Sequence, residues 1–211
     1  MEASPISFYT GTQCELLYAM PGSAPAVTAT ATTSILSANS ATLLPYQLPA
    51  AYFTQQSGTG LGKSLLIKGG GNFTLGSTAD TITLAWYLDT TAGTQLTVMA
   101  QTGAITPVVS ITNGCWEFEL LVTCSVLGTG ANSKLNAVGH VFWGPGNNAA
   151  APTFASNGAT SAAGVTMIGA PQTGVTITNT NAYYLDVFGW WSATTGSPTL
   201  TLTNYMIFGL N

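Results

Sequence analysis

Charged side chains are scarce in this sequence. Arginine is absent, there are three lysines and seven acids, and charged residues make up 5% of the 211 residues. A typical soluble domain contains about 25%. Hydroxyl and amide groups must therefore keep the surface hydrated, or neighbouring subunits must cover much of it. The second explanation favours a subunit of an assembly over a free enzyme.

The lack of basic residues also limits the possible partners. Contacts with the phosphates of nucleic acids come mainly from Lys and Arg, and the formal net charge is −4. We therefore expect no nucleic-acid partner and no membrane partner. No run approaches the roughly 18–20 apolar residues of a membrane span. The segment Met1–Pro5 also lacks the basic region and the apolar run of a signal peptide.

Cysteine and histidine are equally rare. The cysteines are Cys14, Cys115 and Cys124, and an odd number argues against a closed disulfide framework. Cys115 and Cys124 lie on one expected strand, about 30 Å apart, whereas a disulfide requires Cα atoms within about 7 Å. We expect free thiols, as in a reducing compartment. His140 is the only histidine, so we expect no metal ligands, and we assign no catalytic or cofactor-binding residues.

A helical stripe of apolar residues is also missing, and period-two alternation takes its place. The strongest signal spans Cys115–Leu127, a run long enough to predict a bend or bulge. Its core-facing residues are expected to be Trp116, Phe118, Leu120 and Val122. Glu117 and Glu119 then point to the opposite face.

Further strands follow from β-branched and aromatic runs between Gly, Pro and Asn. The expected strands are Ala26–Ala38, Ser64–Lys68, Asn72–Leu75, Thr81–Leu88, Leu96–Gln101, Lys134–Trp143, Gly174–Asn179, Ala182–Trp191 and Thr199–Phe208. Additional core residues are Ile82, Leu84, Trp86, Leu185 and Leu200. Glu15–Met20 forms at most one helical turn. The glycine triplet Gly69–Gly71 predicts a bulge or a close backbone approach.

Together these strands predict a single all-β sandwich over residues 26–211. Residues 1–25 contain three prolines and apolar side chains without a period, so we expect an extended N-terminal arm that packs on a neighbouring subunit. The segment Gly144–Ser161 is expected to be a long loop, and loops of that length are usually functional or disordered.

Enzyme motifs are incomplete. Ser57–Ser64 is similar to a phosphate-binding loop, but Ser57 replaces the first glycine and a strand-like run follows in place of a helix, so we interpret it as a turn. His140 lies in an expected strand and no Gly-x-Ser-x-Gly elbow occurs. Glu117 and Glu119 are spaced as an acid–base pair could be. Such pairs are also common on exposed strand faces, so a hydrolase remains only a third hypothesis.

Two other groups of residues are candidate binding sites. The acids Asp80, Asp89 and Asp186 are too scattered for a calcium loop. Trp190 and Trp191 are adjacent, so they face opposite sides of a strand, and the exposed one could anchor an interface or stack on a sugar. We favour the interface.

The chain resembles the jelly-roll structural proteins of tailed-bacteriophage virions over roughly residues 60–211. The residues that carry the likeness are Leu65–Asp89, Trp116–Leu127, Asp186–Trp191, Thr199–Asn204 and the ending Leu210-Asn211. The likeness is one of style, without a diagnostic motif and without catalytic residues. It implies a jelly-roll-like sandwich and a virion component.

The expected function is therefore that of a non-enzymatic virion structural protein. A capsid decoration or cement protein, which binds and stabilises the phage head, is the first hypothesis. A tail or fibre module that binds a receptor or carbohydrate is the alternative. The expected partners are the major capsid protein or other virion proteins, and further copies in a homo-oligomer such as a trimer. Its location would be the virion, assembled in the host cytoplasm.

Overall fold

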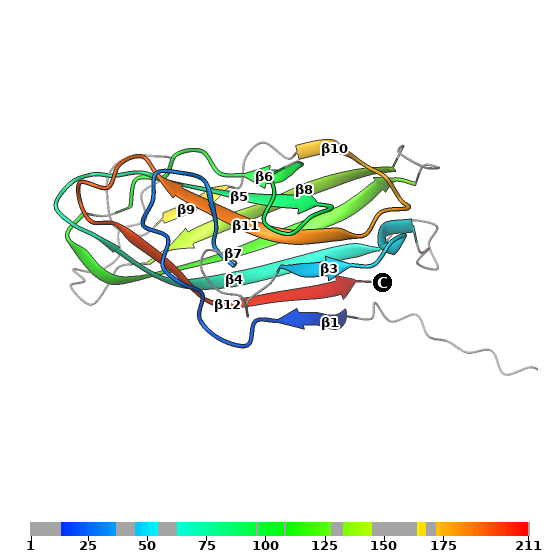
Figure 1. The fold of residues 1–211 in the computed structure, drawn as a ribbon, viewed down its shortest axis with the longest axis horizontal. Coiled ribbons are helices and arrows are strands. Elements are labelled where there is room, and N and C mark those ends of the chain that lie inside the picture. The colour runs from blue at the N-terminus through cyan, green and yellow to red at the C-terminus, as the bar shows by residue number, and fades with distance from the viewer. Residues whose placement is uncertain are drawn as a thin grey trace, which may run out of the picture.

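The computed structural model describes residues 14–36, 45–54, 63–95, 97–107, 109–127, 133–144, 164–167 and 172–210. In this part of the chain two antiparallel sheets pack face to face and form an all-β sandwich (Figure 1). The only helical element described is one 3-10 turn, η1 (Tyr52–Thr54). The expected all-β fold is confirmed.

The larger sheet has seven strands. Its order is β1 (Cys14–Ala19), β12 (Thr199–Leu210), β4 (Ser64–Leu75), β7 (Ile111–Val126), β8 (Ser133–Trp143) and β10 (Gln172–Ile177), with β9 (Gly164–Met167) also paired to β8. Figure 1 shows β1 beside β12 along one edge of this sheet.

The smaller sheet has five strands. Its order is β2 (Thr33–Ser34), β11 (Tyr183–Trp191), β5 (Ile82–Asp89) and β6 (Val98–Gln101), with β3 (Tyr46–Leu48) also paired to β11. β2 and β3 are short and lie one after the other along the same edge of β11.

Period-two alternation places the core between the sheets as predicted. All nine expected core residues are buried: Trp116, Phe118, Leu120, Val122, Ile82, Leu84, Trp86, Leu185 and Leu200. The expected irregularity in the long strand is also present, because the register of β7 against β8 shifts between Cys124 and Val126.

The glycine triplet lies in the middle of the central strand β4, at two places where neighbouring strands come close to its backbone. A Cβ on Gly71 would lie 1.9 Å from the Thr201 carbonyl oxygen, and one on Gly69 would lie 2.7 Å from the Phe118 ring. The partner strand β12 shifts register opposite the triplet, between Leu202 and Asn204. The predicted bulge and close approach are both confirmed, and β4 runs through them as one strand.

Two crossovers lie side by side at one end of the sandwich. The chain passes from β4 to β5 and from β11 to β12, and in each case it changes sheet. The Gly76 amide donates to the Gly196 carbonyl at 3.0 Å, and the Gly196 amide donates to the Asp80 carboxylate at 3.0 Å. The turns at Gly76-Ser77 and Gly196-Ser197 therefore link the β4–β5 connection to the β11–β12 connection.

The expected strand over Ala26–Ala38 is wrong within its described part. Only β2 is a strand there, with an isolated bridge between Val27 and Leu200. The backbone first bonds to Leu200 of the larger sheet and then, at Ile35, to Val187 of the smaller one. The backbone therefore changes from one sheet to the other within this segment and does not stay in a single strand ladder.

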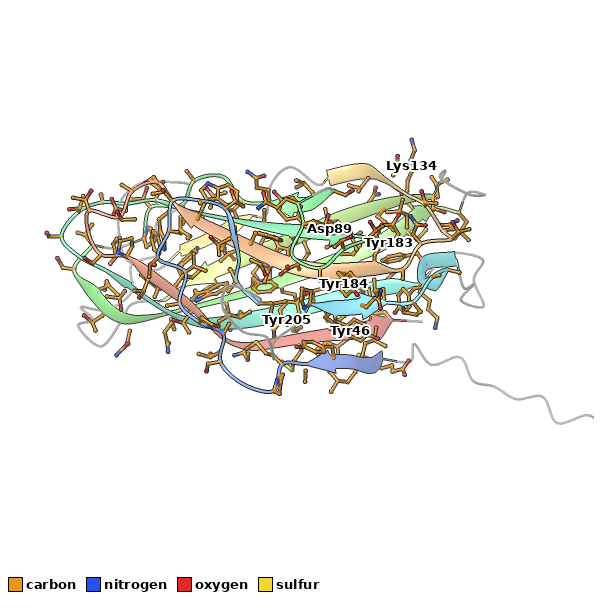
Figure 2. The ribbon with its side chains drawn as sticks, in the orientation of Figure 1. Tyr46, Asp89, Lys134, Tyr183, Tyr184 and Tyr205 are labelled. Atoms are coloured by element: carbon orange, nitrogen blue, oxygen red, sulfur yellow. The ribbon has the colours of Figure 1, made fainter. Side chains whose placement is uncertain are left out.

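The segment Glu15–Met20, for which we expected at most one helical turn, is not helical. It lies largely in β1, which pairs antiparallel with β12, so residues 14–25 of the expected arm lie along this chain's own sheet. The ring of Tyr18 lies 5.6 Å from that of Tyr46 in β3 and 6.1 Å from that of Tyr205 in β12; Figure 2 labels the last two. Residues 1–13 and most of the Gly144–Ser161 loop lie outside the described residues.

Candidate functional site

The outer face of the seven-stranded sheet carries a polar groove over the centre of β4, which we call the β4 groove. Its volume is about 590 Å³ and its floor is formed by Gly69–Gly71. Side chains from β12, β4, β7 and β8 line its sides. The groove lies over Gly70, which stands in the row of the outward-facing Asn204 and Glu117 and has no side chain.

Strand register sets the first row of residues across the groove. Asn204 of β12 lies opposite Gly70 of β4, which in turn lies opposite Glu117 of β7. The next residue in this row is Phe142 of β8, opposite Glu117. The bulged residue Thr203 donates from its hydroxyl to the Gly70 carbonyl at 3.2 Å. Asn204 and Glu117 are both exposed and face each other across a glycine.

A second row runs parallel to the first. Met206 of β12, Lys68 of β4, Glu119 of β7 and His140 of β8 are successive cross-strand neighbours. The Lys68 ammonium and the Glu119 carboxylate form an ion pair at 2.6 Å, with side chains 41% and 42% exposed. An exposed pair of this kind contributes at most about 1 kcal/mol to the free energy of unfolding. Its main consequence is that it places a positive and a negative charge side by side in the groove.

Three of the ten charged residues of the chain, together with its one histidine, line this groove. The sequence has three lysines, seven acids and one histidine, and Lys68, Glu117, Glu119 and His140 all line the β4 groove. The predicted placement of Glu117 and Glu119 on one face of the sheet is confirmed. The sequence does not connect His140, Lys68 or Asn204 to them, because only pairing between strands distant in sequence brings these residues together.

The tryptophan pair does not form an exposed platform. Trp191 is buried in the core and its indole N–H donates to the Val27 carbonyl at 3.1 Å. Trp190 is only partly buried and packs against the cluster of Tyr87 and Phe188 on the smaller sheet. Neither tryptophan lines the β4 groove.

The aspartates have structural positions away from the groove. Asp80 is buried and accepts the Gly196 amide described above, and Asp89 accepts the Thr97 amide at 3.3 Å. Asp186 is buried in β11 and its Oδ1 accepts from the Ser34 hydroxyl at 2.9 Å. Burial raises the pKa of Asp186 to about 7, against the lowering effect of its hydrogen bonds.

The three cysteines are free thiols, as expected. Cys14 and Cys115 are exposed, and Cys115 lines the β4 groove. Cys124 is buried, and burial raises the pKa of its thiol. Cys115 and Cys124 lie on the same strand, β7, so the geometric reason given for excluding a disulfide between them holds.

The two carboxylates of the β4 groove have different partners. Glu119 forms an ion pair with Lys68, whereas no ion pair of Glu117 is found among the described residues. Among the described residues, no group of three or more His, Cys, Asp or Glu is close enough to hold a metal ion. The similarity of Ser57–Ser64 to a phosphate loop falls on residues mostly outside the description.

In the described part of the chain, no helix is long and apolar enough to cross a membrane. Comparisons of the chain with protein-family models, with curated proteins and with solved structures find no match, so the function proposed below rests on the geometry and chemistry of this chain.

Proposed function

We propose that the chain is a non-enzymatic structural protein of a bacteriophage particle, and that it serves as a capsid decoration or cement protein on the head. Its partners would be the major capsid protein, other virion proteins or further copies of itself, as in a trimer. The resemblance in sequence style supports the virion, and the scarcity of charge supports a surface that neighbours cover.

The observation that carries the assembly role is the position of β1 at the edge of the larger sheet. Within the described residues β1 pairs only with β12, and no second strand is seen on its other side there. Free-standing proteins usually protect such an edge with lysine, proline or a bulge. β1 has neither lysine nor proline; its protection consists of one exposed charge, Glu15, and a register shift between Leu16 and Tyr18. Leu16 is 54% exposed there.

A strand from a neighbouring subunit would satisfy this edge. Strand addition supplies main-chain hydrogen bonds and pockets for alternate side chains, and it would cover Leu16. The neighbour need not be charged, which agrees with a chain that has so few charges to offer it.

The test compares two lysine substitutions on purified particles that lack the protein. Leu16→Lys adds a charge to the free edge, whereas Val138→Lys adds the same charge at a similarly exposed position, 43% against 54%, inside a paired strand. We expect Leu16→Lys to lose occupancy on the particles and Val138→Lys to retain it, with both variants folded by circular dichroism. Equal occupancy of the two variants, or absence of the chain from purified particles, would contradict the proposal.

A tail or fibre module is the second candidate, and the β4 groove is the observation that favours it. The position of the chain in particle images distinguishes the two roles directly: density on the head supports a decoration protein, and density at the tail supports the second candidate.

A further inference from the structure

We infer that the β4 groove is a binding site for a neutral oligosaccharide. The inference does not depend on whether the chain sits on a phage head or a tail. It rests on the shape of the groove, on the donors and acceptors that line it, and on its charge.

The shape suits a chain of sugar rings. The volume of about 590 Å³ falls within the roughly 300–1,000 Å³ of small-molecule sites. Asn204 and Glu117 stand on strands separated by β4, hence about 10 Å apart by the usual strand spacing. Between them lies Gly70, which has no side chain. A ring can therefore lie on the backbone of β4 with polar side chains on both sides.

The polar groups match the hydroxyls of a sugar. The Glu117 carboxylate accepts hydrogen bonds, the Asn204 amide both donates and accepts, and the Lys68 ammonium donates. Within the described part of the chain, the Glu117 carboxylate has no ion-pair partner. Vicinal hydroxyls, each a donor and an acceptor, can satisfy these groups in pairs. Met206 lies at one end of the second row and offers an apolar contact for the C–H faces of a ring.

The charges argue against other ligands. Two carboxylates face one lysine that is already ion-paired with Glu119, so a phosphate or an acidic sugar would meet net repulsion. An apolar ligand would desolvate Glu117 without replacing its hydrogen bonds, which is costly. A neutral polyhydroxylated ligand avoids both penalties.

The cysteines provide a probe of the site in the unmodified protein. Cys115 is exposed in the groove, Cys14 is exposed on β1, and Cys124 is buried. We would measure the rate of alkylation of each thiol by mass spectrometry, with and without cellotetraose, chitotetraose, maltotetraose, mannotetraose or, as an acidic counterpart, tetragalacturonate. We expect at least one neutral tetrasaccharide to slow the alkylation of Cys115 several-fold and to leave that of Cys14 unchanged.

Variants locate the contacts. For the sugar that protects Cys115, calorimetric titration should show binding weakened about tenfold or more by Glu117→Gln and by Asn204→Ala, because each removes hydrogen bonds to the ligand. Glu15→Gln makes the same chemical change on exposed β1 and should bind as the unmodified chain does. Both groove residues are exposed, so the variants should fold normally.

Three results would overturn the inference: no protection of Cys115 by any neutral sugar, unchanged binding by both groove variants, or tetragalacturonate binding as tightly as the best neutral sugar. The experiment uses purified protein without particles, so its failure is distinguishable from failure of the proposed virion role.

Discussion

Phe118 lies in the core between the two sheets, among other aromatic side chains. Its ring centroid is 4.9 Å from that of Trp86 in the opposite sheet and 5.9 Å from that of Trp116 on the same strand. Truncation of a buried aromatic side chain typically costs about 3–5 kcal/mol, so Phe118→Ala should lower the free energy of unfolding by that amount in urea denaturation. Thr112→Ala, at an exposed position of the same strand, should change it by less than about 0.5 kcal/mol. A similar small effect for Phe118→Ala would mean that the ring is not in the core.

Asp186 should make stability depend on pH in an unusual direction. Its pKa is raised from 3.8 to about 7 by burial, so between about pH 4 and pH 7 the folded chain holds a proton that the unfolded chain has lost. The contribution of this proton is fully present below about pH 4 and is lost as the pH rises through 7, with a slope of at most about 1.4 kcal/mol per pH unit.

Asp186→Asn removes this titration, and the neutral amide oxygen can still accept from Ser34 and from the Val187 amide. Urea denaturation at pH 4 to 8 should show that the free energy of unfolding of the variant, minus that of the unmodified chain, increases with pH over this window. The other titrating groups are common to both proteins and cancel in the difference. A difference that is constant with pH would show that Asp186 ionises normally in the folded chain.

At the scale of elements, the glycines of β4 decide whether β12, β4 and β7 can approach one another. A Cβ at Gly71 would lie 1.9 Å from the backbone oxygen of Thr201, and backbone cannot move aside as a flexible side chain can. Gly71→Ala should therefore destabilise the chain by about 1–3 kcal/mol or more through overpacking.

Gly103→Ala provides the matched control for this prediction. No atom lies within 4 Å of a Cβ placed at Gly103, and its backbone is not in the left-handed region. Thermal denaturation should show a clear loss for Gly71→Ala and at most a small change for Gly103→Ala. Equal effects would mean that the close approach in β4 is relaxed in solution.

At the scale of the whole molecule, the low charge predicts association that is nearly insensitive to salt. Interfaces of neutral polar and apolar side chains are held by burial and hydrogen bonds, and moderate salt screens only charges. Occupancy on purified particles should therefore change little from low to near-molar salt, and Leu16→Lys should reduce it far more than salt does. Occupancy that collapses with salt would indicate an electrostatic contact.

Removal of residues 1–25 is a poorer test of the same idea. That deletion would remove β1 and the hydrogen bond that the Ala24 amide donates to the Leu202 carbonyl at 2.8 Å. It would therefore damage the sandwich itself. A deletion of residues 1–13 leaves these contacts in place. It tests only the part of the expected arm that precedes β1 in the sequence.

The sequence by itself determined the sandwich and its core. Alternation with period two depends only on the geometry of a single strand, so Trp116, Phe118 and Leu120 could be assigned to the core without knowing their neighbours. The close approach at Gly69–Gly71 could also be predicted from the local sequence. Glycine is the one residue without a Cβ, so it fits where neighbouring atoms leave no room for a Cβ.

Only the tertiary structure decided the site. The β4 groove joins Lys68, Glu119, His140 and Asn204 from four strands, and their register across the sheet cannot be read from any one strand. Composition also failed for Ala26–Ala38 and for β1, since a strand requires a partner edge as well as suitable side chains. The segment after β1 bonds to both sheets in turn, whereas Cys14–Ala19 finds the open edge of β12. Pairing between distant segments, which local propensity does not encode, made that difference.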